Sequence, residues 1–297
     1  MATTLLRLVD DPRAEWAKHR ARARKDLRHL LRSWLLTGRW HYFFLLLSDT
    51  GDLLIRQKYS AFATDRVYAN EPGGWGWLGR KLDRYVLGLP VYRAVRERFA
   101  FVAQTLAEVV RQRLQASKQP VAVLSAPCGL VRDLCRVYAM VCSGTDAARD
   151  RVVFYGFDLD FEGRVLEVAR QRAAAVGLPL HLVQANLLDD APWHWLEERG
   201  FPLSIVNCIG LTPWLSEPEL TTLLQRFAKH LGPGGYVLLD RFNRGKHSNL
   251  GEGAEIRAHY HSAQVYQDAF HASGLAIQAC KPFGDEEGTG YLLQKPN

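Results

Sequence analysis

The sequence lacks several patterns that identify common classes of protein. Its five cysteines include no Cys-x-x-Cys pair, which argues against a thiol-based zinc site or redox motif. No apolar run reaches the roughly 18 residues that a membrane span needs, and the longest candidate, 34–47, is interrupted by Gly38, Arg39 and His41. No signal-peptide core follows Met1. We therefore expect a cytoplasmic protein with no membrane span, whose cysteines are reduced thiols in the core.

Two nucleotide-binding fingerprints are also absent. The segment 121–134, "VAVLSAPCGLVRDL", is an apolar run that ends in a Pro-Cys-Gly turn and continues as a helical pattern. This order is typical of a strand, a ligand-binding turn and a helix. It lacks the glycine spacing of a dinucleotide fingerprint and that of a phosphate-binding loop. The turn is therefore expected to bind a different nucleotide-like group.

Positive charge is concentrated in the first part of the chain. Residues 1–120 contain 22 Lys and Arg against 11 Asp and Glu, whereas the remaining residues have a slight acidic excess within a total of +7. Much of the excess lies in 18–32, "KHRARARKDLRHLLR". A solvated helix face explains such a run, and docking to an acidic partner or to phosphates is the alternative.

The hydrophobic period changes near residue 118. Residues 14–36 and 89–115 have helical spacing, and 70–80, "NEPGGWGWLGR", is expected to be a loop. From 121 onward, β-branched runs alternate with helical patterns, which predicts a mostly parallel sheet covered by helices. A short turn at 284–288 makes the last strand antiparallel. The expected strands are 121–126, 151–158, 180–186, 203–210, 235–242, 275–283 and 289–295.

This arrangement resembles the class I S-adenosylmethionine-dependent methyltransferases, over about residues 100–297. The resemblance implies a Rossmann-like α/β fold with a seven-stranded sheet. It also implies an S-adenosylmethionine-binding domain at 119–297, preceded by a helical cap or lid at 1–118. In the first motif, Gly129 matches the close-approach glycine, Pro127 and Val131 replace two other glycines, and Ser125 replaces the usual acid. Ser125, Ala126, Pro127 and Gly129 are thereby predicted to bind the cofactor.

Later motifs add further predicted cofactor contacts. Asp158 ends the second strand, where a carboxylate can bind both ribose hydroxyls, with Leu159 beside it; a helix cap is the plainer explanation of this Asp. Asn186 stands where many family members have the Asp that meets the adenine amino group, and Leu187 would supply an amide and an apolar wall. Asn207 lies in the fourth motif, 203–215, which ends the fourth strand over the active cleft, and 230–239 resembles the family's glycine-rich turn before strand five.

Aromatic residues gather in the N-terminal half, which holds five of the eight tryptophans. Most are expected in a helical core. The segment 59–77 mixes aromatics with loop residues, and the region 59–85 is expected to form a lid. An aromatic face stabilises a sulfonium cation. The candidates to line the sulfonium are Tyr59, Tyr68, Trp75 and Tyr85. Loop 242–262 would add substrate walls, and its neighbouring histidines, His247, His259 and His261, are expected to be solvated. No metal ligand is assigned.

Three functions are compatible with these observations. The first is a methyltransferase that acts on a small molecule; "NCIG" at 207–210 argues against the nucleobase amino-methyltransferases. The second resembles the azetidine-2-carboxylate synthases of nonribosomal peptide pathways, lyases of secondary metabolism that use S-adenosylmethionine alone and release methylthioadenosine. An acidic carrier protein is a partner that the basic helix would fit. The third is an RNA- or membrane-surface-binding module with a vestigial cofactor fold, which the presence of Asp158 and Asn186 disfavours.

Overall fold

A computed structural model describes residues 28–56, 61–142, 149–160, 163–200, 202–243, 258–285 and 287–297. By its contacts the chain forms two compact units. The first comprises residues 1–96, 160–165 and 246–257, and the second comprises 97–159, 166–245 and 258–297. The two are described separately below. Among the residues described, no helix is both long enough and apolar enough to cross a membrane.

The described part of the first unit is helical, as its sequence period predicts. Residues 28–36 form a helix, followed by the 3-10 helix η2 (Trp40–Leu47) and by α2 (Asp49–Arg56), α3 (Ala61–Ala69) and α4 (Gly76–Leu87). Trp34 is buried and stacks on Tyr42, with ring centroids 5.6 Å apart. Leu30 and Ile55 complete this small core. The predicted helix at 14–36 is thus confirmed from residue 28, and its earlier part lies outside the described residues.

The glycine- and tryptophan-rich stretch 70–80 is not wholly a loop, as the sequence had suggested. The segment turns at Gly74, whose φ is +113°, and α4 begins at Gly76. A Cβ atom on either Gly74 or Gly79 would lie 2.4 Å from the carbonyl oxygen of Leu47. The glycines therefore let the start of α4 pack directly against the backbone at the end of η2. The glycines of this stretch thus serve close packing of the backbone and do not indicate a loop throughout.

Asp83 on α4 is the polar centre of the first unit. Its carboxylate is fully buried and accepts hydrogen bonds from the Ser48 hydroxyl (2.5 Å) and from the backbone amides of Thr50 and Gly73 (both 2.8 Å). The Arg66 guanidinium lies 3.5 Å away. Burial raises the pKa of Asp83, but these hydrogen bonds outweigh it, so that the pKa is lowered overall. One carboxylate therefore holds α4, the start of α2 and the turn before α4 together.

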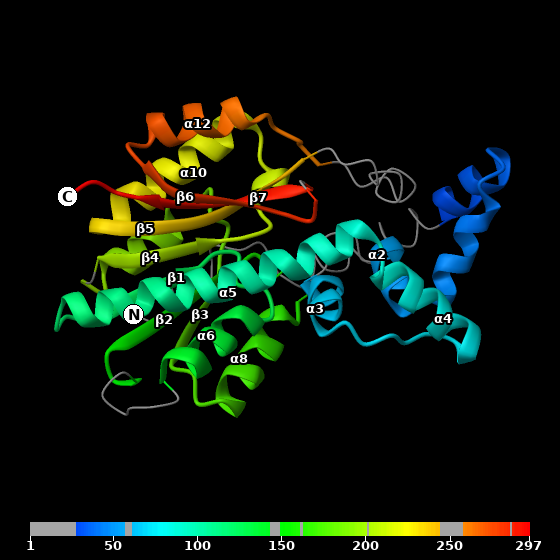
Figure 1. Ribbon diagram of the computed structural model, residues 1–297, viewed down its shortest axis with the longest axis horizontal. Helices are drawn as coiled ribbons and strands as arrows, with labels where there is room; N and C mark the ends of the chain where they lie inside the picture. The colour runs from blue at the N-terminus through cyan, green and yellow to red at the C-terminus, as the bar shows by residue number, and fades with distance from the viewer. Residues whose placement is uncertain are drawn as a thin grey trace. The chain divides into compact units, whose positions relative to one another are not determined.

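The second unit contains the predicted seven-stranded sheet, with strand order β3-β2-β1-β4-β5-β7-β6 (Figure 1). The first five strands run parallel, and β7 is antiparallel to both β5 and β6. This topology confirms the class I methyltransferase fold that the sequence resembles. The strands are β1 (Val121–Ser125), β2 (Val152–Asp158), β3 (Leu180–Gln184), β4 (Leu203–Cys208), β5 (Leu231–Phe242), β6 (Ala276–Phe283) and β7 (Gly288–Gln294).

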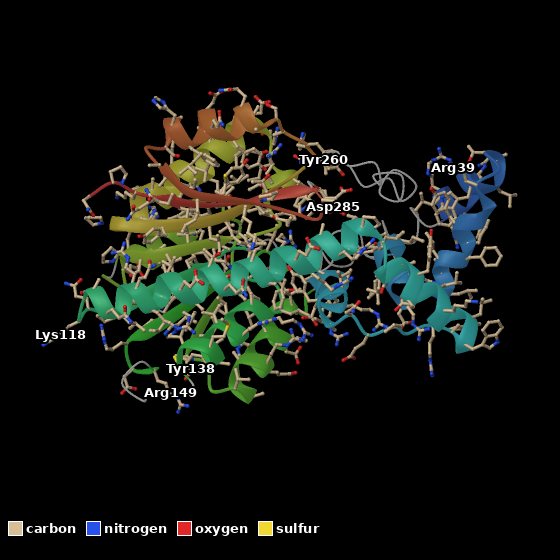
Figure 2. All side chains as sticks on the ribbon, in the orientation of Figure 1. Arg39, Lys118, Tyr138, Arg149, Tyr260 and Asp285 are labelled. Carbon is tan, nitrogen blue, oxygen red and sulfur yellow. The ribbon has the colours of Figure 1, made fainter. Side chains whose placement is uncertain are left out.

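Helices cover both faces of the sheet, as Figure 1 shows. Residues of α5 (Pro90–Ala116), α6 (Arg132–Cys142) and α8 (Val165–Ala175) share one core with Val123 and Ile205. Residues of α9 (Ala191–Glu197), α10 (Glu217–His230) and α12 (Ala263–Ala272) share the other core with Leu124 and Val206. Successive strand residues thus alternate between the two cores, because strand side chains have a period of two. Tyr138 of α6 (Figure 2) packs edge-on to Phe154 of β2, with ring centroids 6.2 Å apart.

Helix α5 crosses the division between the units. It begins at Pro90, where the missing amide costs no helical hydrogen bond, as the sequence predicted. The contact-based division falls between residues 96 and 97, and residues from Val102 to Val110 belong to the core of the sheet. A domain boundary at 118/119, between parts that fold independently, stays a prediction.

Two local expectations are wrong. Residues 231–235, which resemble a turn before strand five, already belong to β5, because Leu231 pairs with Leu203 ahead of a register shift. Cys280 is not a core thiol, since it lies exposed on β6 at the edge of the sheet. All five cysteines are free thiols. The remaining strand ends agree with the sequence to within about two residues.

We predict that Asp83→Asn destabilises the first unit by about 2–4 kcal/mol, because an amide nitrogen would replace an oxygen that accepts buried hydrogen bonds. The lowered pKa of Asp83 means that its contribution is present above pH 4 or so, near the carboxyl's unfolded value of 3.8, and is lost as the pH falls further. Hydrogen exchange at the Thr50 and Gly73 amides, measured against pH, tests both effects.

The matched control is Asp52→Asn, since Asp52 forms an i,i+4 pair with the exposed Arg56. Such a pair contributes about 0.5 kcal/mol or less. Equal protection of the two amides in both variants would show that Asp83 does not hold the unit together.

Candidate functional site

The predicted site residues of the second unit lie at the carboxyl ends of neighbouring parallel strands. Ser125, the last residue of β1, is paired with Gly156 of β2 and with Asn207 of β4. Asp158, the last residue of β2, is paired with Gln184, the last residue of β3. Parallel pairing therefore places Ser125, Asp158 and Asn207 together at the carboxyl ends of the strands. Ligands bind beside these strand ends in open α/β folds.

The turn after β1 is bonded to the strands on both sides of it. The Ala126 amide donates to the carbonyl of Asn207 (2.9 Å), and the Cys128 amide donates to the carbonyl of Phe157 (2.8 Å). The next amide, that of Gly129, donates to the Asp158 carboxylate (2.9 Å). Gly129 has a φ of +49°, in the left-handed region where glycine is favoured. Asp158 is thus bonded to the turn itself. The amides of Arg164 and Val165 at the start of α8 donate to Asp160, so the helix cap that the sequence offered as an alternative is Asp160.

A second polar group joins β1, β4 and the first turn of α6. The amide nitrogen of Asn207 donates to the Ser125 hydroxyl (3.1 Å) and to the Asp133 carboxylate (2.7 Å). Ser125 and Asn207 are each 1% exposed. The side-chain oxygen of Asn207, Oδ1, is buried and has no hydrogen-bond partner. An unsatisfied buried acceptor of this kind is uncommon in proteins and calls for an explanation.

Asp133 is a site residue that the sequence reasoning missed. Burial raises the pKa of its carboxyl, while hydrogen bonds from Leu134 and Asn207 and the charge of Arg98 lower it, and the net shift is upward. The sequence feature that could have identified Asp133 is its place as an acidic residue in the first turn of the helix after the ligand-binding turn. Negative charge is favoured at that position by the helix dipole.

Asp240, near the end of β5, was also missed. Its fully buried carboxylate accepts from the Arg98 guanidinium (2.7 Å) and from the Gly210 amide (2.8 Å). The Asp240 carbonyl accepts from the Thr212 hydroxyl (2.6 Å), which in turn accepts from the Tyr266 hydroxyl (2.7 Å). The signal was a charged residue that follows the apolar run "YVLL". The network joins α5, β5, α12 and the segment after β4.

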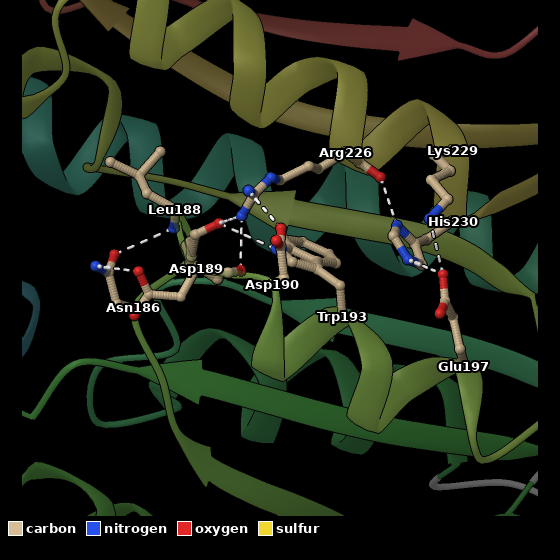
Figure 3. Close-up of polar contacts among 10 residues, drawn as sticks. Asn186, Leu188, Asp189, Asp190, Trp193, Glu197, Arg226, Lys229 and His230 are labelled. Carbon is tan, nitrogen blue, oxygen red and sulfur yellow. Dashed lines mark hydrogen bonds and ion pairs between the residues drawn. The ribbon is translucent and has the colours of Figure 1, made fainter. Parts of the chain in front are cut away.

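Asn186 follows β3 and is held in a compact local turn (Figure 3). Its side-chain oxygen accepts from the Leu188 amide (3.1 Å), and its nitrogen donates to the Asp189 carboxylate (3.2 Å). The side chain of Leu187 is 7% exposed within the sheet core, and its carbonyl accepts from Trp193 (3.0 Å). A contact of either side chain with an adenine ring stays a prediction. Leu159, which follows Asp158, is half-buried, and its carbonyl accepts from Gln184 (3.2 Å).

The aromatic candidates all belong to the first unit. Tyr59 lies outside the described residues. Tyr68 is half-buried on α3. Trp75, at the start of α4, is 81% exposed, and Tyr85 on α4 is 69% exposed. Neither Trp75 nor Tyr85 is therefore part of the core of its own unit, and their facing a sulfonium stays a prediction.

Of the histidines after β5, His259 is exposed, as expected, whereas the side chain of His261 is only 8% exposed. His247 lies outside the described residues. The ring of His261 is stacked on that of His259, with centroids 5.6 Å apart, and its Nε2 lies 2.7 Å from the carbonyl of Leu215. The His259 amide donates to the carbonyl of Pro213 (2.6 Å). These contacts attach the start of the segment before α12 to the segment after β4.

The strand-end residues form a site rich in acceptors. Asp133 and Asp158 supply carboxylates, and Asn207 supplies an amide oxygen that lacks a donor. Such a set can bind a ligand that carries hydroxyl and ammonium groups.

A family model and several solved structures match this chain, and the solved structures share its fold. A family model described as "Putative methyltransferase" matches residues 56–153, about a third of the chain. A Bordetella parapertussis structure, described as a possible exported protein, matches with a TM-score of 0.67 at 17% identity; the match covers 97% of this chain and 98% of that chain. Synechocystis magnesium protoporphyrin IX methyltransferase, solved with SAM bound, matches with a TM-score of 0.50 at 12% identity, over 82% and 94%. The search of curated proteins found no match.

We predict that Arg98→Met destabilises the second unit by about 3–5 kcal/mol, because the Asp240 carboxylate would lose its buried cation. Urea unfolding measures this change. The double variant Arg98→Met/Asp240→Leu should be more stable than Arg98→Met, since it leaves no isolated buried charge. Lys229→Met is the control, because it breaks an exposed pair with Glu197 worth about 1 kcal/mol or less. Equal losses for Arg98→Met and Lys229→Met would contradict the role of the buried pair.

Proposed function

We infer that this chain, which has the fold of the class I S-adenosylmethionine-dependent methyltransferases, binds S-adenosylmethionine and transfers its methyl group to a small molecule. The observation that carries the proposal is the Asp158 carboxylate at the end of β2, bonded to the Gly129 amide in the turn after β1. The carboxylate and the tight turn stand together at the edge of the sheet where this fold binds ligands.

The described residues fit the cofactor at each of its polar ends. A carboxylate can accept several hydrogen bonds, so Asp158 can hold ribose hydroxyls while it accepts from Gly129. The Asn186 oxygen accepts from Leu188 and has a second lone pair for an adenine amino group. The unsatisfied oxygen of Asn207 matches a donor at the methionine end. Ser125, Ala126, Pro127, Gly129, Leu159 and Leu187 complete the proposed contacts.

S-adenosylmethionine, when bound, supplies a methyl group on a positively charged sulfur. A nucleophile can attack the methyl carbon in line with the carbon–sulfur bond, and the sulfur is the leaving group. The protein must then align the nucleophile and exclude water, and it needs little proton transfer. The turn 125–131 is well suited to alignment, because backbone hydrogen bonds tie it to both β2 and β4.

Cyclisation of S-adenosylmethionine is the second candidate. One observation favours it: Asp133, whose pKa is raised, lies beside Asn207 at the same strand end and could accept a proton. In that reaction the amino nitrogen bonds to the γ-carbon, the carbon–sulfur bond breaks, and methylthioadenosine leaves with its electron pair. The nitrogen gives up its proton to the carboxylate. The cytoplasmic location and an acidic carrier-protein partner stay predictions.

Incubation of the purified chain with S-adenosylmethionine, followed by mass spectrometry, separates the two reactions. We expect S-adenosylhomocysteine to form only when an acceptor from a set of small hydroxyl, amine and carboxylic acid compounds is added. Methylthioadenosine from S-adenosylmethionine alone would favour cyclisation. Failure of both S-adenosylmethionine and S-adenosylhomocysteine to bind in calorimetry would overturn both candidates.

We predict that Asp158→Ala weakens the binding of S-adenosylhomocysteine by about 1–3 kcal/mol, because buried hydroxyls would lose their acceptor. Calorimetry measures the loss. Asp158→Asn should cost less, since its oxygen can still accept from Gly129. Asp150→Ala, at an exposed acid just before β2, is the control and should bind as the wild type does. Unchanged affinity in Asp158→Ala would remove this residue from the site.

A further inference from the structure

Asp133 and Asn207 are hydrogen-bonded neighbours, and the side-chain oxygen of Asn207 is buried without a hydrogen-bond donor. We propose that this pair binds the α-ammonium group of the methionine portion of S-adenosylmethionine, and that Asp133 is the residue that selects ligands carrying that group. The inference rests on the proposed function and identifies which atoms recognise one part of the cofactor.

The orientation of the Asn207 side chain is set by its neighbours. Its nitrogen lies 2.7 Å from an oxygen of the Asp133 carboxylate and 3.1 Å from the Ser125 hydroxyl. Exchanging nitrogen and oxygen would place the amide oxygen against the carboxylate, which is repulsive, so the nitrogen must be the atom that faces Asp133. That oxygen is buried without a hydrogen-bond donor, although the residue is only 1% exposed. A donor from a ligand would satisfy it.

The Asp133 carboxylate carries the charge that an ammonium group needs. In the part of the chain that the structure describes, no Lys or Arg lies within 4.0 Å of it, and its hydrogen bonds come from the Leu134 amide (2.9 Å) and from Asn207. The N-terminus of α6 favours the ionised form. Burial disfavours it, and the net pKa is raised. A bound cation would relieve this cost.

The position of the pair agrees with the sequence of the turn. Ser125 stands where the methyltransferase motif has an acid, so this chain lacks the carboxylate expected at the end of β1. Asp133, on the helix that follows the turn, has a carboxylate near the same strand end. Its neighbour Asn207 donates hydrogen bonds both to this carboxylate and to the Ser125 hydroxyl. Asp158 lies two residues beyond the β2 partner of Ser125. Ribose at Asp158 and an ammonium group at Asp133 can therefore belong to one ligand.

A purely structural role for Asp133 predicts a different outcome. If the carboxylate only connects α6 to β4, its replacement should disturb the turn and lower the affinity for all ligands of the site by the same factor. If it binds the ammonium group, the loss should be confined to ligands that have this group. The comparison must therefore be made between two ligands that differ in the ammonium group alone.

Calorimetry with S-adenosylhomocysteine and with its analogue that lacks only the α-amino group makes this comparison. In the wild type we expect the amino compound to bind at least about tenfold more tightly, the effect of a charged hydrogen bond. Asp133→Asn should lower the affinity for S-adenosylhomocysteine by about tenfold or more, and should change the affinity for the deaminated analogue by less than about threefold. Asp133→Ser, which retains a short acceptor for the Leu134 amide, should behave in the same way.

Asp268→Asn is the matched control, because it removes one exposed carboxylate on α12 whose hydrogen bond comes from Gln264. It should leave both affinities unchanged. Equal wild-type affinities for the two ligands, or equal losses for both in Asp133→Asn, would overturn the ammonium site while leaving the proposed function intact. If the wild type binds neither ligand, the proposed function fails, and this inference fails with it. Equal wild-type affinities for the two ligands would overturn the ammonium site even if both Asp133 variants fail to fold.

Discussion

The buried ion pair between Arg98 and Asp240 is the constraint on which the second unit most depends. It joins a helix and a strand separated by 142 positions in the chain, at a distance of 2.7 Å. Asp240 also accepts from the Gly210 amide, and through Thr212 it is connected to Tyr266. Removing a partner would leave a charge in the core. The segment after β4 is therefore held by the same carboxylate that holds α5 against the sheet.

Asp83 has the corresponding role in the first unit. It too is fully buried and accepts from backbone amides, and there is an arginine, Arg66, within 3.5 Å. In each unit, one buried carboxylate thus accepts hydrogen bonds from backbone amides of irregular segments, which lack a backbone acceptor. This arrangement lets turns and helix ends pack closely, since buried backbone amides need acceptors.

The residues at the strand ends depart from the usual motif, yet hydrogen-bond acceptors still gather there. Gly129 still lets the turn approach Asp158, even though Pro127 and Val131 stand where other glycines are expected. The carboxylate that Ser125 cannot supply is present on Asp133, one turn away on the following helix.

The order of strands and helices, the antiparallel last strand and the places of Asp158 and Asn207 were all determined by the sequence alone. They follow from local period and from residues at strand ends, because parallel pairing brings those ends together. The roles of Arg98, Asp133 and Asp240 were decided only by tertiary structure. Each depends on a partner distant in the chain, and local composition cannot specify which distant amide or charge a buried carboxylate will meet.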